Sequence, residues 1–66
     1  MRLQITRLPS NHRTYSIVTS GGNRYGVDDS ELERWLLNLG VDDSIVSAVL
    51  DIEPNQTTTL QTEKAA

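Results

Sequence analysis

Two pairs of adjacent aspartates are the residues of this chain whose type and spacing could do chemistry. Asp28-Asp29 and Asp42-Asp43 each lie inside the tetrapeptide Val-Asp-Asp-Ser. Carboxylates could bind a hard cation, which takes about six or more oxygen ligands around one point. Adjacent carboxylates at a helix start diverge, and the spacing of a calcium-binding loop is absent. We therefore expect no metal and no other cofactor, and we assign the aspartates to helix capping.

The single histidine lacks an acidic partner nearby in the sequence. His12 follows Ser10 and Asn11 in a predicted turn, and no Asp or Glu occurs before Asp28. A Ser-His-Asp triad needs a carboxylate that orients the imidazole ring. The chain also has no cysteine and no Gly-rich phosphate loop followed by Lys and Ser or Thr. We predict no catalytic residue, and we predict that the protein is not an enzyme.

Basic and acidic residues are separated along the chain. Residues 1–27 contain four arginines and no acid, whereas residues 28–66 contain all nine acids against Arg34 and Lys64, and the net charge is −3. The two halves could neutralise each other within one molecule, or the basic half could bind an acidic partner. Under the second interpretation the candidate partner-binding residues are Arg2, Arg7, Arg13 and Arg24.

The elements that must position these residues begin with strands. Alternation of apolar and polar side chains predicts a strand over residues 1–8 and another over 13–20. A Gly-Gly-Asn turn then suits a tight hairpin. A short third strand is predicted over 24–27, with Tyr25 and Val27 on one side.

The two Val-Asp-Asp-Ser copies predict two short helices. Asp28 and Asp42 are placed as N-caps, whose side chains accept hydrogen bonds from free N–H groups of the first turn. The first helix has an apolar stripe at helical spacing and ends at Gly40, which tolerates a left-handed conformation. The stripe consists of Leu32, Trp35, Leu36 and Leu39.

The second helix is apolar over an unusually wide arc. It is predicted to run to about Ile52 and to stop before Pro54. At 100° per residue its apolar side chains cover about 200° of the helix surface. We therefore expect this helix to lie between the first helix and the sheet, at the centre of the core. The arc consists of Ile45, Val46, Ala48, Val49, Leu50 and Ile52.

The turn between the helices resembles the helix-turn-helix of bacterial repressors of the lactose-repressor type. The resemblance spans Leu39 to Leu50 and is carried by Gly40, Val41, Val46, Ser47, Val49 and Leu50. It implies a second helix that enters the major groove of DNA. The outer face of that helix presents Asp43, Ser44, Ser47 and Asp51 where such motifs often carry basic or amide side chains. Carboxylates repel phosphates, so this face departs from the motif.

These patterns predict the α+β class. We expect an antiparallel β-hairpin or three-stranded meander followed by two short packed helices, in one domain over residues 1–54. Residues 55–66 form a polar tail, in which 56–62 has the β propensity of an edge strand and the last four residues are expected to be disordered.

The predicted function is a small non-enzymatic protein-interaction or accessory module. It would bind a protein partner or a second copy through a sheet edge, the basic hairpin or a leucine patch at Leu37. The alternative is a nucleic-acid-binding regulator that uses the basic hairpin or the helix pair. The sequence has neither a secretory signal nor a membrane-spanning run, so we expect a cytoplasmic protein without a membrane partner.

Overall fold

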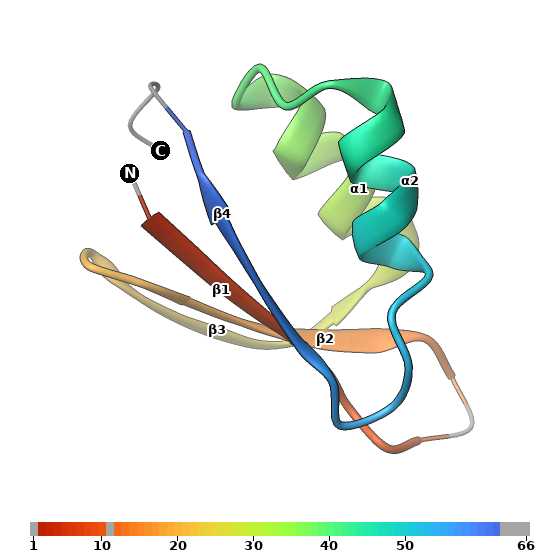
Figure 1. The fold of residues 1–66 in the computed structure, drawn as a ribbon. Coiled ribbons are helices and arrows are strands. Elements are labelled where there is room, and N and C mark those ends of the chain that lie inside the picture. The colour runs from red at the N-terminus through yellow and green to blue at the C-terminus, as the bar shows by residue number, and fades with distance from the viewer. Residues whose placement is uncertain (1, 11, 63–66) are drawn as a thin grey trace.

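The computed structural model describes residues 2–10 and 12–62 as an antiparallel sheet with two helices on one face (Figure 1). The sheet has the order β3-β2-β1-β4. This architecture confirms the predicted α+β class and the C-terminal edge strand. The expected disorder of the last four residues lies outside the described residues. The elements are β1 (Arg2–Arg7), β2 (Thr14–Thr19), β3 (Gly22–Asp28), α1 (Asp29–Asn38), α2 (Asp43–Leu50) and β4 (Thr57–Gln61).

β1 lies between β2 and β4. Its apolar and polar side chains alternate, so they point to opposite faces of the sheet. Leu3 and Ile5 point toward the helices and are fully buried. Arg2 and Gln4 are exposed on the opposite face, which we call the outer face. In register, Ile5 lies opposite Ile17 of β2 and Thr58 of β4, so the helix-facing side continues across all three strands.

β3 contains an irregularity that the sequence pattern does not predict. Its register with β2 shifts between Tyr15 and Ile17, and Gly26 has a φ of +76°. An extra residue in one strand changes the face to which the next side chain points. The prediction that Tyr25 and Val27 share one side is therefore wrong, because Tyr25 is 81% exposed whereas Val27 is buried.

α1 has the predicted cap, stripe and end. The Asp28 carboxylate accepts a hydrogen bond from the backbone N–H of Glu31 at 2.8 Å. Leu32 and Leu36 are fully buried, and the helix is followed by Gly40 with a φ of +83°. α1 packs against β2 and β3, so it is the helix that covers the core.

α2 differs from its prediction. It ends at Leu50 rather than at about Ile52, and Asp42 stands at its N-cap without a side-chain capping hydrogen bond. Within the helix only Val46 and Val49 are buried, and Ile45 is 44% exposed. The expectation that this helix forms the centre of the core is therefore wrong. The physical reason is that α2 packs chiefly on α1, whereas α1 packs on β2 and β3.

Three side chains from the sheet side hold the C-terminal end of α2, and we call them the α2 clamp. Arg7 donates from Nη1 to the Ile52 carbonyl at 2.9 Å, and the Tyr15 hydroxyl donates to the Leu50 carbonyl at 2.6 Å. Arg13 lies 3.7 Å from the Asp51 carboxylate. Carbonyl groups at a helix C-terminus lack partners within the helix and attract positive charge, and α2 has no basic residue in its own last turn. Two of the four N-terminal arginines therefore serve the fold.

Because Tyr15 belongs to the α2 clamp, we expect the stability of the fold to change with pH in the alkaline range. Burial raises the pKa of Tyr15 above its ordinary value of 10.0. Because the unfolded chain then loses this proton at lower pH than the folded chain, stability falls as pH rises through the folded pKa. We expect the free energy of unfolding to decrease as the pH rises above about 10, the ordinary pKa of tyrosine, by less in Tyr15→Phe than in the parent. Urea denaturation at each pH measures the difference. Equal losses in both proteins would exclude Tyr15 as the titrating group.

Candidate functional site: a groove beside the β4 edge

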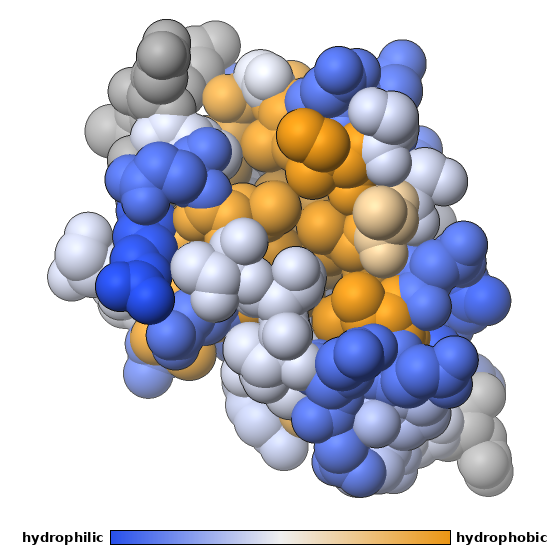
Figure 2. Space-filling view, in the orientation of Figure 1, coloured by the Kyte–Doolittle hydropathy of each residue, from blue (hydrophilic) through white to orange (hydrophobic). Residues whose placement is uncertain are grey.

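An apolar groove opens between β4 and the turn that leads into α2. Its volume is about 560 Å³, large for a chain of this size. Figure 2 shows apolar side chains gathered in the gap between the sheet and the helices. We call this apolar groove the β4 groove. It is lined by Leu39, Gly40, Val41, Asp42, Ile45, Leu60, Gln61 and Thr62.

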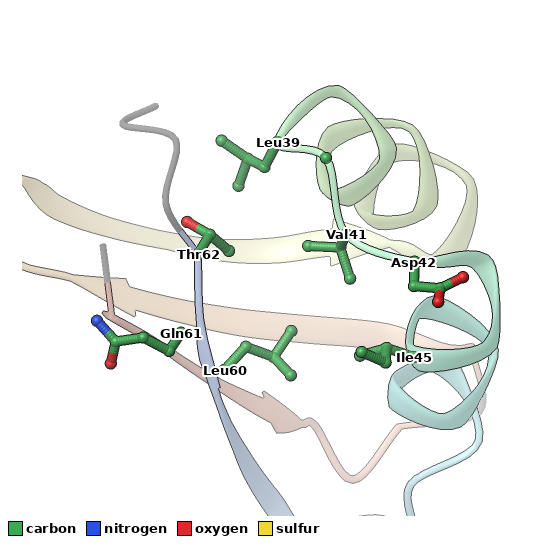
Figure 3. Close-up of a pocket in the computed structure, with 8 residues that line it drawn as sticks. Leu39, Val41, Asp42, Ile45, Leu60, Gln61 and Thr62 are labelled. Carbon is green, nitrogen blue, oxygen red and sulfur yellow. The ribbon is translucent and has the colours of Figure 1, made fainter.

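The apolar side chains of the β4 groove come from both layers of the fold. Leu60 of β4 and Ile45 of α2 point toward each other, and Val41 lies above them in the view of Figure 3. Leu39 and Thr62 lie at the other end and are buried. The groove is therefore a side of the two-layer structure that the described residues leave open.

β4 forms one wall of the groove and is also an edge strand. Its residues pair with β1 in unbroken register from Thr57 to Gln61, and the described residues place no strand on its other side. The strand contains no proline and no charged residue. Proline, charged side chains and bulges are features by which natural edge strands avoid pairing with other chains. The outer edge of β4 thus offers free backbone N–H and C=O groups beside an apolar groove.

The charge around the groove is negative. Asp42 is the only charged residue among those that line it, and Asp43 follows at the start of α2; both are exposed. The Asp42 carboxylate is free of a capping bond, as described above. Among residues 2–10 and 12–62, no lysine or arginine lines the groove.

The structure does not bring the predicted partner-binding arginines together. Arg7 and Arg13 belong to the α2 clamp. Arg2 is exposed on the outer face, whereas Arg24 lies opposite the buried Ile17 and so belongs to the helix-facing side. Arg13 is itself about half exposed, beside the Asp51 carboxylate. The arginines of the basic hairpin therefore do not gather on one surface.

Two other predicted features are exposed. Leu37 is 42% exposed on α1, away from the buried stripe of that helix. His12 is exposed in the connection between β1 and β2. Residues 2–10 and 12–62 hold no group of three or more His, Cys, Asp or Glu side chains arranged to bind a metal ion.

Comparisons of the chain with protein-family models, with curated proteins and with solved structures find no match. In the part of the chain that the structure describes, no helix is long and apolar enough to cross a membrane. The β4 groove itself is therefore the feature on which a function can be argued.

Sequence reasoning did not select the residues of the β4 groove, although a signal for them is present. The apolar arc of about 200° on α2 is wider than one contact surface requires. Its partners in the chain bury only Val46 and Val49, which leaves Ile45 facing the groove. An apolar arc in excess of the available partners is the pattern that could have indicated a binding surface.

Proposed function

We propose that this protein is a non-enzymatic interaction module that binds another polypeptide in the β4 groove. The observation that carries the proposal is the coincidence of two unpartnered features. The apolar side chain of Ile45 and the free edge of β4 meet at one groove. Apolar grooves and free sheet edges are both recurrent sites of protein recognition.

The charge distribution supports a protein partner over a nucleic acid. Phosphate binding depends on clustered cations, and the arginines of the hairpin are dispersed. The residues near the groove are acidic or neutral. Of the exposed hairpin arginines, Arg2 and Arg24 lie on opposite faces of the sheet, and Arg13 lies beside the Asp51 carboxylate.

Site-specific crosslinking tests this proposal. A photo-reactive phenylalanine analogue replaces Ile45 in one variant and Val18 in the control. Val18 is a matched β-branched residue, 41% exposed, on the outer face. In extracts of cells that naturally make the protein, we expect a polypeptide to be crosslinked from position 45 and not from position 18. A second substitution in the groove, Leu60→Glu, should abolish it. Recovery of the same species from both positions, or of none, would contradict the proposal, and recovery of nucleic acid alone would favour the alternative.

A further inference from the structure

We infer that the β4 groove accepts one extended strand from a different polypeptide, with apolar side chains at alternate positions and basic side chains near Asp42 and Asp43. This inference rests on the proposed function and specifies its partner. Three properties of the groove lead to it: its position beside an edge strand, the arrangement of its apolar side chains, and its charge.

The position beside β4 determines the conformation of the occupant. A chain that pairs with the outer edge of β4 would extend the sheet by one strand and satisfy the free N–H and C=O groups. Successive side chains of a strand point to opposite faces. Every second side chain would therefore point to the helix-facing side, where Val41 and Ile45 are only partly covered. The occupant needs apolar residues at those alternate positions.

The charge of the groove determines the sign of the charge that a partner strand should carry. Asp42 lines the groove and Asp43 follows it, and none of the described residues that line the groove is basic. Complementary charge speeds association and suppresses wrong partners, whereas like charges brought together weaken binding. Lysine or arginine beside the apolar positions of the added strand is therefore favoured, and glutamate or aspartate is disfavoured.

The β4 strand of a second copy is not a suitable occupant of the groove. In an isologous dimer the β4 strands of two copies would pair with each other. The helix-facing side of each would then offer Leu60 as its single large apolar side chain, since Thr58 and Thr62 are its neighbours on that side. Both copies would also bring the same acidic residues to the interface.

The test uses short synthetic peptides as probes. The first alternates valine with threonine and carries lysine at both ends. The second replaces the lysines with glutamate, and the third is the lysine peptide with N-methylated backbone amides, which cannot donate to a neighbouring strand. Binding to the ¹⁵N-labelled protein is followed by NMR titration. We expect the lysine peptide to shift β4 and α2 amide resonances, and the other two to bind about tenfold more weakly or not at all.

Variants of the protein locate the bound peptide. Ile45→Glu should weaken the lysine peptide by about tenfold or more, because an apolar anchor is replaced by another acid. The control Val18→Glu, on the outer face, should leave binding unchanged. Changing both Asp42→Asn and Asp43→Asn should reduce the preference for lysine over glutamate peptides. Asparagine is itself a good N-cap residue, so α2 is expected to persist in that variant.

The outcomes separate this inference from the proposed function. Equal binding of lysine and glutamate peptides, or of the N-methylated peptide, overturns the inference and leaves groove binding intact. Self-association by light scattering that Ile45→Glu abolishes also overturns it, because the occupant is then a second copy. If no peptide binds while position 45 still crosslinks a polypeptide, the inference fails alone. If crosslinking from position 45 is absent as well, the proposed function fails with it.

Discussion

Leu36→Ala is expected to lower the free energy of unfolding by about 3 kcal/mol or more. Leu36 is fully buried in α1 and belongs to the cluster of buried residues that joins the helices to the sheet. Its removal would cost both the transfer free energy of the side chain and the cavity that it leaves. A chain of this length is expected to have a total stability of roughly 3–10 kcal/mol, so the loss is a large share of it. Urea denaturation, followed by the fluorescence of Trp35, measures the change.

The adjacent residue provides a matched control for this substitution. Leu37 has the same side chain on the same helix but is 42% exposed. Leu37→Ala is expected to change the free energy of unfolding by no more than about 0.5–1 kcal/mol. Similar losses in the two variants would show that α1 does not present Leu36 to the core, and the assigned face of the helix would then be wrong.

Tyr15→Ala is expected to be at least as damaging, at about 3–5 kcal/mol. Tyr15 is fully buried on β2, and its hydroxyl donates to the Leu50 carbonyl at the end of α2. The substitution removes the aromatic ring from the core and leaves that carbonyl without this donor. Such a loss is expected to leave little folded protein at ordinary temperature.

Tyr15→Phe separates the two contributions. It keeps the ring and removes only the hydroxyl, so the expected loss is about 1 kcal/mol, the net value of one hydrogen bond. Thermal denaturation by circular dichroism compares the parent with both variants. If Tyr15→Phe leaves the free energy of unfolding unchanged, the hydrogen bond of the α2 clamp does not stabilise the fold. If Tyr15→Phe loses as much stability as Tyr15→Ala, burial of the ring is not the main contribution of Tyr15 to stability.

The sequence predicts the elements of this fold well because their signals are local. Alternation in β1 and β2, the Asp28 cap and the Gly40 terminus each depend on residues within a few positions of one another. The two short helices and the edge strand β4 follow from the same kind of signal. These parts needed no knowledge of tertiary contacts.

The predictions from the sequence are wrong where tertiary contacts determine which face a side chain occupies. The Gly26 bulge reverses the expected face of Tyr25, because a single extra residue changes the register with β2. The apolar arc of α2 is wider than the part that the fold buries, but the sequence alone does not show which side of the arc stays uncovered. The residues of the β4 groove were not predicted for the same reason. Ile45 and Leu60 are distant in sequence, and only the fold places them together.

The bulge in β3 also makes the two edges of the sheet unlike each other. β4 is regular from Thr57 to Gln61, whereas the opposite edge is interrupted at Gly26. A fibril built by stacking copies edge to edge needs both edges to be competent, since each molecule must pair on two sides. Here one edge is receptive and the other is blunted. Deleting one residue at the bulge, so that β3 pairs regularly with β2, would therefore risk open-ended polymerisation, a hazard that the present geometry limits.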